Sequence, residues 1–265
     1  MKSYIGLPGA LVPITCPVSE DVRHERSSSE LVTFSGRRHV QLGPRVRRSW
    51  SVEYGVEHPR DYAVLDALTR WDTPLSWVGA LAQATNLLTP EQAALEDVGL
   101  SVASQVRGVL QVGDLWVPQW VAGSAISTLI LTNAGGVPVR YGVPVTVSAY
   151  VERADAATPV QMVFQFLDST GGVLVSQTRE DVAGVGVRRA AWTLSPPEGA
   201  ATLTVRFRAA AIVAAPQVTW TPTVTPWAPG RGVHRVVVLP GSESPIVAHS
   251  KQVLTSAAYT IMEVG

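Results

Sequence analysis

The chain has 265 residues, of which 46% are hydrophobic and only 16% are charged, and its 21 basic residues balance 21 acidic ones. This balance argues against intrinsic disorder, and equally against a nucleic-acid binder driven by bulk basic charge. The length fits one large domain or two ordinary ones. The single cysteine, Cys16, rules out an intrachain disulfide and a cysteine-based zinc site.

The N-terminal residues 1–21 contain one lysine and a modest apolar stretch. Three prolines and a glycine interrupt that stretch, which is unlike the continuous apolar core of a signal peptide. No apolar run in the chain reaches the ~18–20 residues that span a bilayer. We therefore expect a protein that is not secreted through its own leader and has no membrane span.

The best helix signal covers residues 59–71, PRDYAVLDALTRW. Pro59 suits the first helical turn, and Asp61 lies near the positive end of the helix dipole. Its apolar stripe consists of Tyr62, Leu65 and Leu68. A second, short helix is expected at 91–97, with Thr89 as its N-cap and Gln92 reaching back to it.

Strand signals dominate the rest of the chain. Residues 143–151, VPVTVSAYV, alternate between an apolar face and a polar face with the period of two that is typical of a strand. A turn of Asp, Ser, Thr and two glycines at 168–172 predicts a hairpin. Further strands are expected at 160–167, 173–177, 188–194, 203–209, 236–239, 246–248 and 259–264.

Two loop-like segments divide the chain. Residues 82–88 and the Pro- and Gly-rich residues 222–232 resemble the linkers through which a chain enters and leaves an inserted domain. We therefore expect a first domain formed by residues 1–83 and 233–265, interrupted by a second domain of residues 84–232.

The sequence contains no nucleophile elbow, no zinc-binding helix motif and no phosphate-binding loop. The five histidines are scattered without ligand spacing. Acidic neighbours such as Glu96 and Asp97 do not show the two carboxylates across a cleft that glycoside cleavage needs. The expectation is that the protein is not an enzyme and holds no cofactor and no metal.

An arginine cluster admits three interpretations. The first is contact with phosphate or nucleic acid, and the second is a solvated strand face or pairing with Glu53, Glu57 and Asp61. The third is a contact between subunits, because arginine is enriched at interfaces. The zero net charge disfavours the first, and we retain the cluster as a candidate oligomer interface. Its members are Arg37, Arg38, Arg45, Arg47 and Arg48.

Five of the eight tryptophans lie between residues 116 and 227. Aromatic side chains on a sheet face can stack on the apolar faces of sugar rings, but tryptophan also serves as a core anchor because it buries a large area. Both interpretations stay open for each residue. The candidate carbohydrate-binding residues are Trp116, Trp120 and Tyr150.

Residues 33–79, TFSGRRHVQLGPRVRRSWSVEYGVEHPRDYAVLDALTRWDTPLSWVG, resemble the opening domain of distal or minor tail proteins from long-tailed actinobacterial phages. The C-terminal SKQVLTSAAYTIMEVG looks like the matching last strand. The resemblance implies a tail-tube-like β-sandwich with one flanking α-helix. It also implies assembly into a ring at the tail tip.

The middle segment resembles a jelly-roll carbohydrate-binding module. Asn86-Leu-Leu-Thr followed by Glu96 is similar to that family's opening, and residues 137–151 match one of its central strands. Residues 219–232 look like its closing strand. The family often carries an Asp in that strand which helps to hold a structural calcium, and VTWTPTV has none.

Together the resemblances imply a mostly-β virion protein with an inserted jelly roll. Its expected role is structural, in a ring that connects tail tube to baseplate, with a hexamer favoured and a trimer second. Expected partners are tail-tube and baseplate proteins and host cell-wall glycan, with synthesis in the host cytoplasm. Two rivals are a cell-wall-binding adhesin and a glycan-cleaving tail enzyme. A ring of neutral subunits closes without charge repulsion, and copies around it would add avidity.

Overall fold

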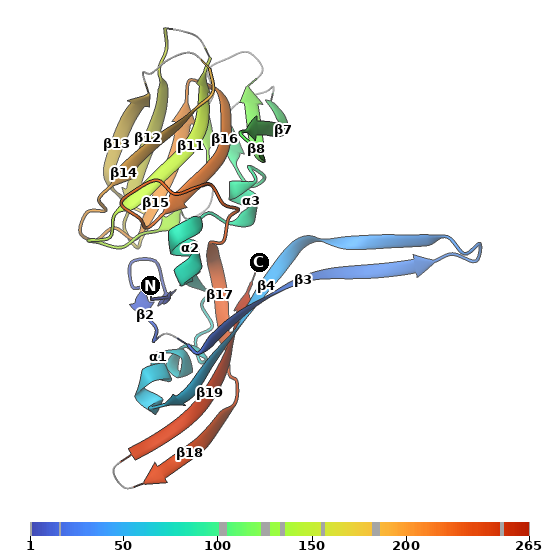
Figure 1. Cartoon of the computed structure of the whole chain (residues 1–265), viewed down its shortest axis with the longest axis vertical. Helices are drawn as coiled ribbons and strands as arrows, with labels where there is room; N and C mark the ends of the chain where they lie inside the picture. Colours follow the sequence, from blue (N-terminus) through green and yellow to red (C-terminus); the bar gives the residue numbers. More distant parts are fainter. Residues whose placement is uncertain are drawn as a thin grey trace. The chain divides into compact units, whose positions relative to one another are not determined.

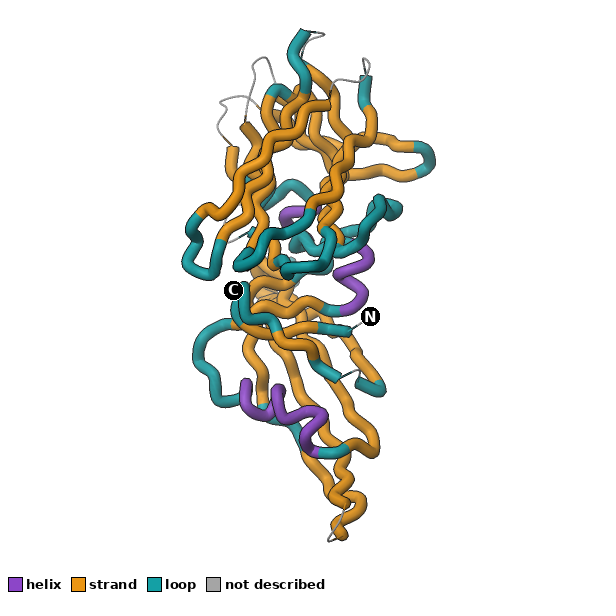
Figure 2. Tube along the Cα trace, turned by 90° about the vertical axis from the view of Figure 1, so that its left-hand side faces the viewer, coloured by secondary structure: helices purple, strands orange, loops and turns teal. Residues whose placement is uncertain are grey.

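The computed structural model describes residues 2–15, 17–100, 105–122, 128–132, 136–154, 157–181, 186–249 and 252–264. The chain divides into two compact units (Figure 1). The sandwich unit comprises Ser3–Val12 and Ser76–His234, and the arm unit comprises Pro13–Leu75 and Arg235–Gly265. Both are built mainly of strands, as the sequence predicted (Figure 2).

The sandwich unit includes three segments that the sequence placed in the other domain, residues 3–12, 76–83 and 233–234. Strand β1 (Tyr4–Gly6) pairs antiparallel with β5 (Leu75–Val78), so that Tyr4 lies opposite Val78. The Tyr4 ring also meets the edge of Trp220, with 5.6 Å between ring centroids. These contacts join residues far apart in the chain, which local patterning does not report. The short strand β2 (Val12–Pro13) follows.

Two antiparallel sheets form the sandwich. A six-stranded sheet has the order β13-β12-β15-β9-β6, with β10 paired to β15. Its strands are β6 (Gly99–Leu100), β9 (Thr128–Ile130), β10 (Val137–Pro138), β12 (Val160–Leu167), β13 (Val173–Asp181) and β15 (Thr202–Arg208). A five-stranded sheet has the order β14-β11-β16-β8-β7. Its strands are β7 (Gln105–Val112), β8 (Leu115–Ala122), β11 (Val145–Arg153), β14 (Arg188–Leu194) and β16 (Ala210–Thr219).

One apolar core fills the space between the sheets. Phe164, Phe166 and Phe207 enter it from the six-stranded sheet, and Val147 and Trp120 enter from the five-stranded sheet. Each of these side chains is at most 1% exposed. Burial of such large side chains is the main stabilising contribution available to a unit of this size.

The predicted hairpin between β12 and β13 is confirmed. Asp168 Oδ1 accepts hydrogen bonds from Thr170 N (2.8 Å), Thr170 Oγ1 (2.7 Å) and Gly172 N (2.9 Å). These bonds favour the ionised carboxylate, and they lower the pKa of Asp168, with the Thr170 hydroxyl as the largest cause. The turn is therefore fixed by its own side chain.

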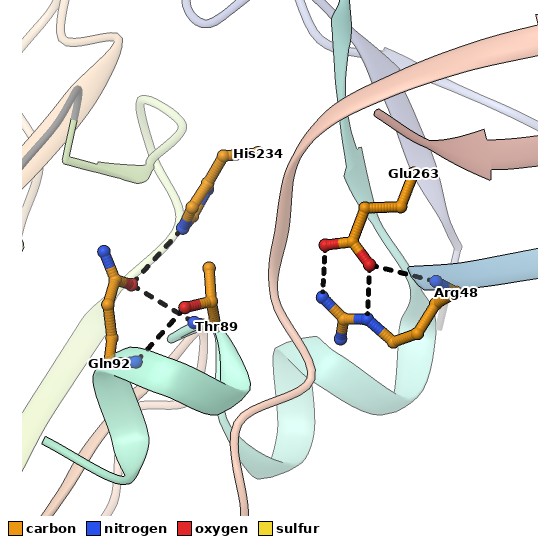
Figure 3. Close-up of polar contacts among 5 residues, drawn as sticks. All are labelled: Arg48, Thr89, Gln92, His234 and Glu263. Atoms are coloured by element: carbon orange, nitrogen blue, oxygen red, sulfur yellow. Dashed lines mark hydrogen bonds and ion pairs between the residues drawn. The ribbon is translucent and has the colours of Figure 1, made fainter. Parts of the chain in front are cut away.

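Three helices are present in the described part of the chain: α1 (Pro59–Leu68), α2 (Ala80–Thr85) and α3 (Pro90–Ala93). The predicted N-cap of α3 is confirmed: Thr89 Oγ1 accepts from Gln92 N (3.2 Å), and Gln92 Oε1 accepts from Thr89 N (3.1 Å) (Figure 3). The same Gln92 oxygen lies 3.4 Å from Nε2 of His234. None of these helices is long and apolar enough to cross a membrane.

The strands of the arm unit pair antiparallel around β19. They are β3 (Ser19–Val32), β4 (Arg38–Glu57), β17 (Val233–Leu239), β18 (Glu243–His249) and β19 (Gln252–Glu263). One edge of β19 pairs with β4, and the other edge is shared by β18 and β17. The sequence predicted shorter strands at 236–239, 246–248 and 259–264, and it gave no strand bounds for β3 and β4.

Helix α1 is the flanking helix that the sequence predicted, and its buried side chains are Tyr62, Leu65 and Leu68. The Tyr62 ring packs against Tyr54 and Tyr259, with centroids 5.8 and 6.0 Å away. Its hydroxyl donates to Glu243 Oε1 (2.6 Å) and contacts the Thr255 hydroxyl. Burial raises the pKa of Tyr62, and burial also raises that of Tyr259 to about 12. Tyr62 and Tyr259 thus stay neutral and act as packing groups.

The outer part of the β3–β4 hairpin, residues 25–47, is called here the hairpin arm. In the described structure it pairs only within itself, because β4 meets β19 from Ser49 onward. An irregularity at Gly43–Pro44 interrupts the ladder between Arg26 and Ser28. Proline lacks the N–H that a regular ladder needs, so a bulge is where a strand can hold it. The arm extends as a two-stranded ribbon (Figure 1).

Candidate functional site

A pocket of about 440 Å³ lies on the face of the five-stranded sheet that points away from the sandwich core. Strands β7, β8, β11 and β14 form its floor, and the segment that follows β16 forms its wall. The lining residues are Val112, Leu115, Val117, Tyr150, Arg189, Val224, Thr225, Pro226 and Trp227.

The wall of this pocket covers a face that the sequence pattern predicted to be wet. Val145 and Val147 of β11 point into the core and are fully buried, as expected. However, Thr146 and Ser148 on the opposite face are also only 2% exposed. Thr146 Oγ1 donates to the carbonyl of Thr221 (2.6 Å) in the covering segment. The prediction of a wet face is therefore wrong here, because a distant segment folds over it.

Asn86 fixes the covering segment to the sheet. It is fully buried, and its amide nitrogen donates to the carbonyls of Pro216 (3.1 Å) and Ala228 (2.9 Å). Its oxygen accepts from the backbone nitrogens of Leu88 and Val218, both at 3.2 Å. All four hydrogen-bonding positions of the amide are used. Asn86 therefore holds the wall of the pocket in a single position against the sheet.

Backbones approach closely at the same place. Arg231 N donates to the carbonyl of Asn86 (3.0 Å), and Gly232 N donates to the carbonyl of Leu88 (2.8 Å). A Cβ on Gly232 would lie 1.7 Å from the carbonyl oxygen of Leu87. Glycine is therefore required at this crossing, where the chain enters and leaves the sandwich.

Gln217 links the wall to the floor. This residue is 1% exposed, and its nitrogen donates to the Pro226 carbonyl (2.9 Å) and to Thr225 Oγ1 (3.2 Å). The indole Nε1 of Trp227 donates to the Pro216 carbonyl (3.3 Å). The aromatic side chain in the wall is thus oriented before any ligand arrives.

Arg189 lies at the junction of floor and wall. Its Nη2 donates to Gln217 Oε1 (2.6 Å), Thr225 O (2.6 Å) and Ser148 Oγ (3.1 Å). Its guanidinium carbon is 5.8 Å from the centroid of the Tyr150 ring. Burial lowers the pKa of Arg189, because partial desolvation penalises the cation.

Of the three aromatic residues expected to bind sugar, Tyr150 lines the pocket. Trp116 is 64% exposed, but it shares the strand face of Trp120 and so lies on the other side of β8 from the pocket. Trp120 is 1% exposed within the core. The prediction for Trp120 is wrong, because a side chain buried between two sheets cannot contact a ligand. Arg189 and Trp227 also line the pocket and were not among the predicted site residues, although the tryptophan in the exit segment was a usable signal.

The arginine cluster is divided by the structure. Arg48 is buried and forms a bidentate pair with Glu263, with Nη2–Oε1 at 2.9 Å and Nε–Oε2 at 3.0 Å (Figure 3). An interface role for Arg48 is therefore wrong, since its guanidinium is used within the chain. Arg37, Arg38 and Arg47 are exposed on the hairpin arm.

The pairing partners also differ from those suggested by proximity in the sequence. Arg38 contacts Glu30 across the ribbon at 3.3 Å, and the partner of Arg48 is Glu263. Asp61, one of the expected partners, instead contacts Arg60 at 3.8 Å. The backbone of Arg45 lies in β4, but its side chain is outside the described residues.

No carboxylate is among the described residues that line the pocket. Within the described ranges, no group of three or more His, Cys, Asp or Glu side chains is placed to hold a metal ion.

No protein-family model and no curated protein matches the chain. Among solved structures, a tailspike enzymatic domain of bacteriophage CBA120 is similar at 14% identity and a TM-score of 0.40, over 51% of this chain and 21% of that one. A CBM22-1 xylan-binding domain from Paenibacillus barcinonensis matches at 15% identity and a TM-score of 0.31, over 50% of this chain and 90% of that one. The CBM22-1–GH10 modules of a Clostridium thermocellum xylanase match at 14% identity and a TM-score of 0.33, over 46% and 26%. The chain thus spans about a fifth to a quarter of the tailspike and xylanase chains. At these values the similarities say nothing about its ligand.

Proposed function

We propose that the chain is a structural subunit of a phage tail tip, forming a ring between tail tube and baseplate, and that its sandwich unit binds host cell-wall glycan. The observation that carries the binding role is the pre-formed pocket between Tyr150 and Trp227. Apolar and aromatic walls with a few placed polar groups are typical of small-ligand sites. The exposed hairpin arm supports the structural role.

The pocket offers two kinds of contact to a sugar. The rings of Tyr150 and Trp227 supply apolar faces, and Val117 and Leu115 extend the floor between them. The Tyr150 hydroxyl has no hydrogen-bond partner in the described part of the chain, so it is available to a sugar hydroxyl. Because hydrogen bonds already fix the wall, little ordering cost remains to be met on binding.

Replacing Tyr150 or Trp227 with alanine is expected to weaken binding to host cell-wall polysaccharide by about tenfold each, the equivalent of ~1.4 kcal/mol. Isothermal titration of the full chain with solubilised wall polysaccharide measures this. Trp116→Ala is the matched control, because it removes an exposed tryptophan outside the pocket. Equal weakening by Trp116→Ala, or none by either pocket variant, would place binding elsewhere.

The hairpin arm carries the observations that favour self-association. Val32, Val40 and Leu42 are 52–62% exposed, and the register places them on one face of the ribbon. Phe34 at the tip is fully exposed. A two-stranded ribbon is marginal alone in water, and exposed apolar stripes mark contact surfaces. We propose that this face packs on a neighbouring copy, in a hexamer first and a trimer second.

The triple variant Val32→Thr, Val40→Thr, Leu42→Thr is expected to shift the chain from a ring to a monomer, since it removes apolar contacts while keeping strand-forming residues. Sedimentation velocity at high protein concentration measures the mass. Val173→Thr with Leu174→Thr is the control, since these exposed side chains lie on β13 of the sandwich. A wild-type monomer at every concentration, or an unchanged ring in the triple variant, contradicts the proposed assembly.

The cell-wall-binding adhesin remains the alternative, with the pocket as its main feature. Particles assembled with the triple arm variant separate the two roles: a structural subunit predicts defective tails, and an adhesin predicts intact tails that still adsorb. We propose that the chain does not cleave glycan, because hydrolysis needs paired carboxylates and the described pocket lining has none.

A further inference from the structure

The charge of Arg189 distinguishes this pocket from a neutral sugar cleft. Arg189 is the single Arg, Lys, His, Asp or Glu among the described lining residues. Its three acceptors, from Gln217, Thr225 and Ser148, are all neutral oxygens. In the described part of the chain no carboxylate comes within 4 Å of its guanidinium.

The adjacent arginine shows that the fold neutralises such charges elsewhere. Arg188 precedes Arg189 on β14 and points to the other face, where it meets Asp181 at 2.8 Å. Arg48 in the arm unit is likewise matched by Glu263. A partly buried cation without a counter-charge is costly, and burial already lowers the pKa of Arg189. A bound anion would offset that cost.

The guanidinium is also positioned to receive a ligand. All its hydrogen bonds use Nη2, so Nε and Nη1 have no partner among the described residues and three N–H groups are left to donate. Charge-assisted bonds from arginine to carboxylate or phosphate oxygens are about twice as strong as neutral ones. The Tyr150 ring, 5.8 Å from the guanidinium carbon, places an apolar stacking surface beside these donors.

We propose that the pocket selects an acidic saccharide, in which a sugar ring packs on Tyr150 and Trp227 and its anionic group binds Arg189. The inference rests on the proposed glycan-binding function and names its ligand class. The shared chemistry is a negatively charged oxygen group on a sugar, either the carboxylate of a uronic acid or a phosphodiester. A neutral sugar would leave the arginine uncompensated, and an isolated anion would leave the aromatic walls unused.

The test is a binding series with the full chain. Its probes are uronic-acid oligosaccharides, phosphodiester-linked sugar polymers, and the same compounds after carboxyl reduction or dephosphorylation. We expect wild type to bind one acidic series at least tenfold more tightly than its neutral counterpart, with affinity that falls as salt rises. Arg189→Gln keeps an amide donor for the Thr225 carbonyl and should abolish the preference while retaining the weaker neutral binding. Arg208→Gln is the control, because it removes the same charge from an exposed site on β15.

The outcomes separate this inference from the function on which it rests. Equal affinity for acidic and neutral sugars, sensitive to Tyr150→Ala, would overturn the acidic preference and leave glycan binding intact. An acidic preference that survives in Arg189→Gln would also overturn it. Absence of binding to every probe and to host cell walls would overturn both proposals. If Arg189→Gln loses all binding, hydrogen exchange of residues 221–230 shows whether the wall has opened. An opened wall would mean that Arg189 only positions that segment, which also contradicts the inference.

Discussion

Replacing Glu263 with alanine is expected to destabilise the arm unit by about 3–5 kcal/mol, because it leaves the buried guanidinium of Arg48 without its counter-charge. Glu263 accepts two hydrogen bonds from that side chain and a third from the Arg48 backbone nitrogen (3.1 Å) (Figure 3). The guanidinium also lies over the ring of Trp50, 5.5 Å from its centroid. The substitution of Glu263 therefore removes three hydrogen bonds between β4 and β19.

The matched control is Glu30→Ala, which breaks the Arg38 pair on the hairpin arm. The side chains of Arg38 and Glu30 are 75% and 45% exposed, and exposed ion pairs contribute only about 0–1 kcal/mol to stability. Urea unfolding with amide hydrogen exchange measures both variants, and the loss of protection should fall on β4 and β19. Similar effects from the two variants would show that Arg48 is not buried in solution.

The second large effect is expected for Trp120→Ala, which should cost about 3–5 kcal/mol of sandwich stability. Trp120 is 1% exposed between the two sheets, so its removal leaves a cavity that the surrounding side chains fill only in part. Trp116→Ala, four residues earlier on the same strand, removes a 64% exposed ring and should change stability by less than about 0.5 kcal/mol.

Thermal unfolding followed by near-ultraviolet circular dichroism distinguishes the two tryptophans. At a temperature where the Trp120 variant is still folded, the proposed affinity for cell-wall glycan should equal that of wild type, because the ring faces away from the pocket. A loss of affinity in the folded Trp120 variant, or a stable protein after its removal, would restore Trp120 as a ligand contact.

Local patterns predicted the local structure well. The boundaries of β12 and β14 match the expected residues 160–167 and 188–194. The alternation of apolar and polar residues and the turn residues that define these boundaries lie within each segment or next to it. The capping box at Thr89 is likewise confirmed, since its partner is three residues away. These features need no knowledge of the rest of the chain.

The candidate site could be predicted only in part, because it depends on contacts between distant residues. Arg48 finds its carboxylate 215 residues away, so its burial could not be separated from the exposed arginines around it. Trp116 and Trp120 share a strand face, and only the extent of the opposite sheet decides which one is covered. Arg189 belongs to the site only because the segment after β16 lies across β14.

The crossing of Asn86 and Leu88 with residues 230–232 has a mechanical consequence. In the role proposed above, the chain would transmit tension from a bound cell wall to the rest of the particle. In the sandwich unit the incoming and outgoing strands of chain are fastened to each other by backbone hydrogen bonds and by the Asn86 amide. Tension would therefore be shared by these two linked segments and would not detach either one alone from the sandwich. The pocket wall is anchored at the same point, so it should keep its shape while the chain is under tension.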